Sequence, residues 1–255
     1  MITVGIDIGS ITTKVAMMKD GKLMGTDVTF TGYNAEKAWR TILDDILAKN
    51  NLAMSDVNCI VSTGYGRNMV SIATKAITEI TCHAAGAHYL NPHIRSIIDI
   101  GGQDSKSIVI DEKGKVVDFA MNDKCAAGTG RFLEVMARAL EVDLDGFGDI
   151  SLRGKNPARI SSLCTVFAES EVISLISKGE SRENIIAGIH ESIASRVASM
   201  AKRVGIRTPV MMTGGVAKNI GVVKALENKL GIDIEVSVNA QVNGAIGASV
   251  LAAEL

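Results

Sequence analysis

The residues best suited to chemistry occur twice in this chain, as an aspartate that closes a buried strand just before a glycine turn. Asp7 precedes Gly9, and 92 residues later Asp99 precedes Gly101; Lys14 and Lys106 follow at the same spacing. A strand-end carboxylate can hold hydrated Mg²⁺, and the backbone N–H groups of a glycine turn can surround phosphate oxygens. The repeat therefore predicts duplicated half-domains whose turns face a polyphosphate across a cleft.

Polar side chains beside these turns suit a nucleotide site. Gln103 and Asp104 are types that can orient an attacking water. A third turn, Gly214-Gly215, follows an expected strand and can admit an adenosine or its phosphates, with Gln241 near the base or ribose. The expected catalytic residues are Asp7, Asp99, Gln103 and Asp104. The expected nucleotide-binding residues are Gly9, Ser10, Ile11, Thr12, Thr13, Lys14, Gly101, Gly102, Gly214, Gly215 and Gln241.

A cysteine offers a second kind of chemistry. Cys125 is followed by small residues and then by apolar residues at helical spacing, which places it at or just before the N-terminus of an expected helix. Partial positive charge gathers at a helix N-terminus, so the position favours a phosphate, a thiolate or an iron–sulfur cluster with thiolate ligands. Packing as a small buried side chain is the plain alternative.

The other cysteines are Cys59, Cys82 and Cys164, and no two of the four form a CxxC motif. In a reducing compartment a disulfide framework is disfavoured, which leaves core packing, redox chemistry or metal ligation. Cys59 lies in an apolar strand and is expected in the core. Cys82 precedes His83 at the start of an expected helix; packing is favoured there, with metal ligation as the alternative.

The elements that must position these residues alternate between strands and helices. A strand over residues 2–9 leads through the first glycine turn into a second strand, 12–18, which ends at the hairpin turn Asp20-Gly21. A strand after the glycines argues against a dinucleotide fingerprint or a P-loop, both of which need a helix there. We also expect helices over residues 34–49, 82–90, 132–140, 164–176, 183–204, 216–230 and from 242 onward, strands over 57–62, 210–213 and 232–236, and a polar connection over 143–157.

Composition limits the function classes. Of the 255 residues 47% are hydrophobic, ample for a core, and the net charge of -1 with scattered Lys and Arg argues against nucleic acid as a partner. No apolar run approaches the roughly 20 residues of a membrane span, so we expect a soluble, cytoplasmic α/β protein without a membrane partner. We expect two lobes around a nucleotide cleft, residues 1–94 and 95–255, with the final helix packing back on the first lobe.

Several motifs together resemble a known family. They are GIDIGS (5–10), TGYGR (63–67), IDIGGQDSK (98–106), MNDKCAAGTGRFLEVMA (121–137), CTVFAESEVIS (164–174), AGIHESIASRV (187–197) and MTGGVAKN (212–219). This set resembles the activator component of 2-hydroxyacyl-CoA dehydratases, in the ATPase family that includes the ATP-hydrolysing subunits of benzoyl-CoA reductase. The glycine loops alone are similar to the wider superfamily of acetate and sugar kinases, heat-shock chaperones and actin, which implies a duplicated actin-like ATPase fold.

The resemblance also implies cofactors and partners. It implies a homodimer with one 4Fe-4S cluster between its subunits, held by Cys125 and Cys164 of each, and ATP or ADP with Mg²⁺ in each cleft. In such a protein an electron arrives from ferredoxin or flavodoxin and, coupled to ATP hydrolysis, passes to a 2-hydroxyacyl-CoA dehydratase.

Three alternatives stay open at this point. One is an ATPase subunit of a benzoyl-CoA reductase-type enzyme. Another is a small-molecule kinase of the same fold, with Asp99 or Asp104 as general base, although a kinase gives no reason for Cys125 and Cys164 in these settings. The third is a nucleotide-gated scaffold in the manner of actin, without a chromophore.

Overall fold

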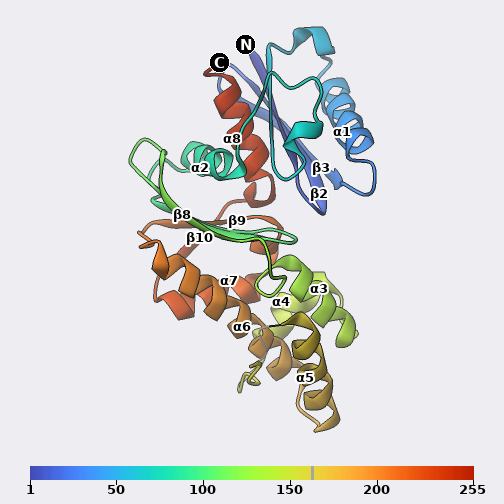
Figure 1. Cartoon of the computed structure of the whole chain (residues 1–255), viewed down its shortest axis with the longest axis vertical. Coiled ribbons are helices and arrows are strands. Elements are labelled where there is room, and N and C mark those ends of the chain that lie inside the picture. Colours follow the sequence, from blue (N-terminus) through green and yellow to red (C-terminus); the bar gives the residue numbers. More distant parts are fainter. Residues whose placement is uncertain (162–163) are drawn as a thin grey trace.

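The computed structural model describes residues 1–161 and 164–255, which form two five-stranded sheets flanked by helices (Figure 1). The strand orders are β3-β2-β1-β4-β5 and β10-β9-β6-β7-β8. The strands are β1 (Ile2–Ile8), β2 (Thr12–Lys19), β3 (Lys22–Phe30), β4 (Cys59–Thr63), β5 (Lys75–Ala76), β6 (Ser96–Ile100), β7 (Ser105–Ile110), β8 (Val116–Asn122), β9 (Val210–Thr213) and β10 (Ile234–Val236). The helices are α1 (Ala35–Lys49), α2 (Glu79–Leu90), α3 (Gly130–Ala139), α4 (Leu144–Ser151), α5 (Thr165–Ser177), α6 (Arg182–Arg203), α7 (Ile220–Leu230) and α8 (Asn243–Ala252).

The predicted duplication is present in the strand pairing itself. In each sheet three antiparallel strands are followed by a parallel neighbour, β4 beside β1 and β9 beside β6. The registers also agree, because Asp7 pairs with Lys14 across β1 and β2, and Asp99 pairs with Lys106 across β6 and β7. The two candidate turns therefore have the same backbone setting, one in each sheet.

The C-terminal helix α8 packs against the first sheet and against α2. Glycines allow this close approach: a Cβ at Gly5 would lie 2.0 Å from the Ala245 carbonyl oxygen, and one at Gly247 would lie 1.7 Å from the Cys82 carbonyl oxygen. Thr3 near the start of β1 also hydrogen-bonds the Ser249 carbonyl oxygen at 2.9 Å. The end of the chain is thus fixed to its beginning, while a division at residues 94 and 95 stays a prediction.

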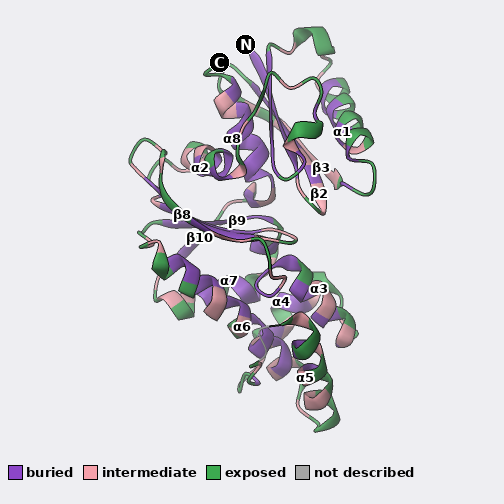
Figure 2. Cartoon of the chain, in the orientation of Figure 1, coloured by how far each residue is buried: buried purple, intermediate pink, exposed green. Residues whose placement is uncertain are grey.

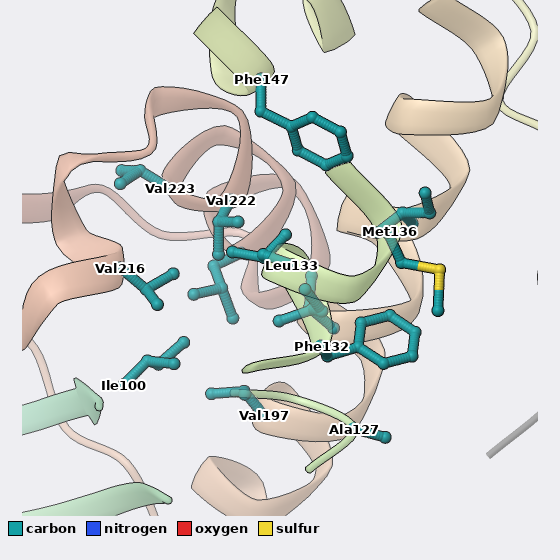
Figure 3. Packing of buried hydrophobic residues seen from close by; sticks show 14 of the residues in the cluster. Ile100, Ala127, Phe132, Leu133, Met136, Phe147, Val197, Val216, Val222 and Val223 are labelled. Carbon is teal, nitrogen blue, oxygen red and sulfur yellow. The ribbon is translucent and has the colours of Figure 1, made fainter. Parts of the chain in front are cut away.

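A large apolar core lies beneath the second sheet, with α6 at its centre. Figure 2 shows α6 and α8 as mainly buried, whereas much of α5 is exposed. In Figure 3, Phe132, Leu133 and Met136 of α3 lie among side chains from α4, α6 and α7. This packing supports the helix that follows Cys125.

Two expectations about this region were wrong. Residues 143–157, expected to be a polar connection, contain the helix α4, because fully buried Phe147 anchors the segment in the core despite two helix-weakening glycines. The helix expected from residue 216 instead starts as a 3-10 turn, Gly215–Lys218, and α7 begins only at Ile220, where Asn219 caps it.

The cysteines also differ in detail from expectation. Cys82 lies inside the first turns of α2 rather than at its start, and it is buried. Cys125 lies in the connection from β8 to α3, whose N-cap is Thr129, while Cys164 is itself the N-cap of α5. Cys125 thus lies just before the N-terminus of its helix, as one form of the expectation had it, whereas Cys164 lies at the N-terminus of α5.

Among the helices of the described residues, none combines the length and the apolar content that crossing a bilayer requires.

We predict that Gly247→Ala destabilises the protein by about 3 kcal/mol, because its methyl group would force α2 and α8 apart. The matched control is Gly146→Ala in α4, where a Cβ meets nothing within 4 Å. That change removes backbone entropy from the unfolded chain and should stabilise by about 0.5–1 kcal/mol. Urea unfolding measures both; equal effects of the two substitutions would contradict the packing described for α8.

Candidate functional site

A cavity of about 740 Å³ lies where the two sheets present their glycine turns. All expected catalytic and nucleotide-binding residues line it except Thr13. The expected residues that line the cavity are Asp7, Gly9, Ser10, Ile11, Thr12, Lys14, Asp99, Gly101, Gly102, Gln103, Asp104, Gly214, Gly215 and Gln241. Residues far apart in the sequence thus meet in one cleft.

Thr13 lies on the opposite face of β2. Successive strand side chains alternate between faces, so Thr12 and Lys14 reach the cavity while Thr13 points away. Its hydroxyl is buried and 2.9 Å from the Thr31 hydroxyl, which donates to the Gly9 carbonyl oxygen. Thr13 therefore stabilises the first glycine turn through Thr31 rather than contacting the cavity.

The duplicated aspartate–lysine pairs have the same geometry but different surroundings. Lys14 Nζ donates to Asp7 Oδ2 at 3.1 Å, and Lys106 Nζ donates to Asp99 Oδ2 at 3.1 Å. The first pair retains some contact with solvent, with side-chain exposures of 14% and 8%, whereas the second has 2% and 3%. Only the first pair is open enough to exchange partners with a ligand at low cost.

Lys106 contacts three carboxylates. Besides Asp99, its ammonium lies 2.8 Å from Asp104 and 3.4 Å from Glu79. Burial opposes a charge on Lys106, but the facing carboxylates outweigh it and raise the pKa of Lys106 above its ordinary value. Its charge therefore persists at physiological pH.

The neighbouring carboxyl groups respond in opposite directions. Burial alone would raise the pKa of Asp99, but His83 and Lys106 outweigh it and hold that pKa well below its ordinary value. Burial dominates at Glu79 and raises the pKa of that carboxyl. Asp99 is thus a permanent anion, while Glu79 accepts a proton more readily than Asp99.

Glu79 and His83 line the cavity, and the sequence analysis missed both as site residues. Both lie on α2, which was expected to begin at residue 82. Thr78 caps the helix by accepting from the Thr81 N–H, and Glu79 is the acidic residue of its first turn. A threonine followed by a glutamate before an apolar run is a readable helix start, so this signal was available.

Gly214 brings the third turn against the second. It has φ of +87°, and a Cβ there would lie 2.3 Å from the Ile100 carbonyl oxygen, so only glycine fits. The 3-10 turn that follows places Val216, Lys218 and Asn219 on the cavity wall. The turn after β9 therefore forms one wall of the cleft.

The second glycine turn is bonded directly to α3. The N–H groups of Gly130 and Arg131 donate to the carbonyl oxygens of Gly101 and Gly102 at 2.9 and 2.8 Å. These groups belong to the first turn of α3, whose N–H groups have no partner within the helix. The cleft wall and the segment carrying Cys125 are thus one connected unit.

Cys125 and Cys164 lie outside the cavity and differ from the other cysteines in exposure. Cys125 is half-buried and held by Asn122, which bonds both its N–H and its carbonyl oxygen; Cys164 is exposed. Cys59 and Cys82 are buried, and burial raises the pKa of Cys82 to about 12, which disfavours the thiolate that ligation needs. Within the described residues of one chain, no group of three or more His, Cys, Asp or Glu side chains could hold a metal ion.

The comparisons with known proteins agree with this geometry. The activator of lactoyl-CoA dehydratase from Anaerotignum propionicum is 51% identical over 255 residues, covering 100% of this chain and 98% of that protein. The (R)-2-hydroxyglutaryl-CoA dehydratase activating ATPase of Acidaminococcus fermentans is 48% identical over 252 residues, with coverages of 98% and 96%. One of the subunits of benzoyl-CoA reductase from Thauera aromatica is 36% identical over 259 residues, with coverages of 97% and 92%.

A solved structure matches the whole fold. The activator of the 2-hydroxyisocaproyl-CoA dehydratase from Clostridium difficile, with bound ADPNP, superposes with a TM-score of 0.94 at 45% identity, covering 100% of this chain and 95% of that one. The expected actin-like ATPase fold is confirmed. The model of the BadF/BadG/BcrA/BcrD ATPase family matches residues 4–252, and the chain belongs to this family of ATPases.

Proposed function

We propose that this chain is the ATP-dependent one-electron activator of a 2-hydroxyacyl-CoA dehydratase. The observation that carries the proposal is the combination of a nucleotide-sized cleft with two accessible cysteines outside it, joined by the backbone hydrogen bonds from α3 to Gly101 and Gly102. Relatives named as activators of such dehydratases, at 48% and 51% identity over nearly their whole length, support the proposal.

In the cleft, the two glycine turns would hold the phosphates through backbone N–H groups, with Lys14 beside them. Asp7 fits hydrated Mg²⁺, because it lines the cavity and shares its charge with a single partly exposed lysine. Asp104 is held by Lys106, which leaves exposed Gln103 as the side chain that orients the attacking water. Asp99 lines the same cavity, held by Lys106 and Thr213, and would face the water shell of a metal bound there.

Cys125 and Cys164 fit a 4Fe-4S cluster shared by two copies of the chain. A 4Fe-4S cluster takes four thiolates and supplies a one-electron store; the described residues of one chain present only two accessible thiols. The segments that follow them, α3 and α5, pack against each other. A two-fold axis would provide the second pair from an identical surface.

The exposed face of α5 supports the homodimer. Next to Cys164, Val166, Phe167, Ile173 and Ile176 have exposures of 66, 67, 55 and 43%. Apolar side chains gathered on one helix favour burial against a partner. A reduced ferredoxin or flavodoxin is the proposed donor, in the cytoplasm, and the dehydratase is the proposed acceptor.

The second candidate is an ATPase subunit of a benzoyl-CoA reductase-type enzyme. It retains the cleft and the cysteines and is favoured only by the 36% identity to the reductase protein from Thauera aromatica. The greater identity to dehydratase activators makes it the weaker candidate. An electron-transfer assay with the purified chain distinguishes the two candidates: the first predicts reduction of a dehydratase, and the second predicts reduction of a ring reductase.

We predict that anaerobically purified protein carries four irons per dimer and that Cys125→Ser and Cys164→Ser each lose them, because a serine hydroxyl is a poor cluster ligand. Iron and sulfide analysis of the dimers measures this. Cys59→Ala is the control, since Cys59 is buried in β4 and should keep the full complement. Full iron in either serine variant would refute that residue as a ligand.

Asp7→Asn and Gln103→Ala should keep the iron but lower ATP turnover at least ~100-fold, since each removes a group that acts on the phosphate or the water. Phosphate release under anaerobic conditions is the assay. Asp118→Asn, an exposed aspartate on β8, is the control with unchanged turnover. Colourless protein from the two cleft variants would show that the cleft and the cysteine site are not separable.

Lys106→Met should destabilise the protein by about 3–5 kcal/mol, because it leaves the buried Asp99 and the partly exposed Asp104 and Glu79 without their shared cation. Lys14→Met is the matched change in the other half; it removes a partly exposed lysine from one carboxylate, Asp7, and should cost clearly less. Denaturant unfolding at pH 7 compares the two. Equal losses would mean that the duplicated pairs are energetically equivalent, contrary to their burial.

A further inference from the structure

A buried histidine in the middle of α6 has no part in the chemistry described above. His190 is 1% exposed, and the Phe147 ring from α4 meets it edge-on at 5.4 Å and 74°. Its Nδ1 has no hydrogen-bond partner in the part of the chain that the structure describes. Burying an unpartnered polar atom is unfavourable, so an apolar side chain would fill this place better if packing were the only role.

The other ring nitrogen contacts a residue that lines the nucleotide cleft. His190 Nε2 lies 3.3 Å from Nδ2 of Asn219, which lines the cavity. Asn219 Oδ1 accepts from the Val222 N–H at 3.2 Å as the cap of α7, and this fixes the orientation of the amide. Because Nδ2 can only donate, Nε2 is the acceptor and the imidazole proton resides on Nδ1.

The ring is suited to remain an acceptor. Burial lowers the pKa of His190 to about 3, so the imidazole stays neutral at physiological pH. An imidazolium would carry two N–H donors and would oppose the amide rather than accept from it. The contact is thus maintained wherever the protein works.

Three helices hold this pair in place. A Cβ at Gly221 of α7 would lie 2.4 Å from His190 Nδ1, and a Cβ at Gly148 of α4 would lie 2.8 Å from Asn219 Oδ1. Both positions therefore need glycine to let the helices close around the pair. The orientation of the Asn219 amide is fixed at both its oxygen and its nitrogen, whereas capping α7 requires only the oxygen.

We propose that His190 is a positioning residue, which aims the Asn219 amide so that its second N–H donates to an acceptor on the bound nucleotide. Nδ2 carries two N–H groups, and His190 takes one of them. Ribose oxygens, ring nitrogens and phosphate oxygens are the acceptors that a nucleotide offers. The inference rests on the proposed placement of the nucleotide in this cleft and adds to it a binding residue and the group that orients it.

The test compares two replacements of His190 by calorimetric binding of ADPNP to the purified full chain, with thermal unfolding alongside. His190→Leu fills the space but cannot accept, and should weaken binding on the order of 5- to 10-fold at an unchanged or higher Tm. His190→Gln offers an amide oxygen near the place of Nε2 and should bind within about twofold of wild type. Met200→Leu, a buried change on α6 away from Asn219, should bind as wild type.

A second variant separates orientation from stability. Asn219→Ser keeps a side-chain oxygen that can cap α7 but removes both amide N–H groups, so it should weaken binding as His190→Leu does. The double variant should be no weaker than Asn219→Ser alone, since both changes remove the same hydrogen bond. Additive losses in the double variant would overturn the proposal.

Two further results would overturn it as well. Equal, wild-type affinity in His190→Leu and His190→Gln would show that the contact does not aim the amide. Equal weakening in both, with a lowered Tm, would show a purely structural role. In both cases the wild-type protein still binds ADPNP, so the proposed function is unaffected. If the wild-type protein does not bind ADPNP, the proposed function itself is wrong.

Discussion

The cleft depends on one buried ammonium. Lys106 on β7 contacts Asp99 at the end of β6, Asp104 in the turn between them, and Glu79 on α2. Charges at this depth are stable only when paired, so the lysine fixes the spacing of three elements at once. Because α2 also packs against α8 and through it against the first sheet, the same cation helps to set the position of one lobe relative to the other.

The duplication produced two aspartate–lysine pairs, and the two pairs differ in their surroundings. Both pairs span the same register and the same 3.1 Å. Lys106 contacts three carboxylates and is 2% exposed, whereas Lys14 is 14% exposed and contacts one carboxylate among the residues that the structure describes. A ligand phosphate can compete with Asp7 for Lys14 because the Lys14 ammonium is partly exposed and lines the cavity. The first copy is therefore the one that can respond to a nucleotide, and the second maintains the geometry to which it responds.

The sequence was most informative where chemistry and local backbone coincide. The Asp-x-Gly repeat, its hairpins and nearly all cavity residues of the glycine turns could be read in order, since turn types and strand alternation are local properties. Residues that reach the cleft by tertiary packing were missed. Glu79 and His83 are brought there by the packing of α2, and Asn219 lies at the junction between a 3-10 turn and α7. The helix α4 was missed for the same reason, because a core around Phe147 outweighs the low helix propensity of its glycines.

The two accessible cysteines are not equivalent in their connection to the cleft. Cys125 precedes a helix whose first N–H groups bond the carbonyl oxygens of Gly101 and Gly102, so any shift of that turn moves its segment through two hydrogen bonds. Cys164 is the N-cap of α5, which packs against α3 and α6. A packed interface tolerates small sliding, whereas hydrogen bonds at 2.8 and 2.9 Å do not. A nucleotide that displaces the second glycine turn would therefore act on the Cys125 segment through these two hydrogen bonds, and on Cys164 through the packing of α3 against α5. A set of thiols shared by two chains would register that difference.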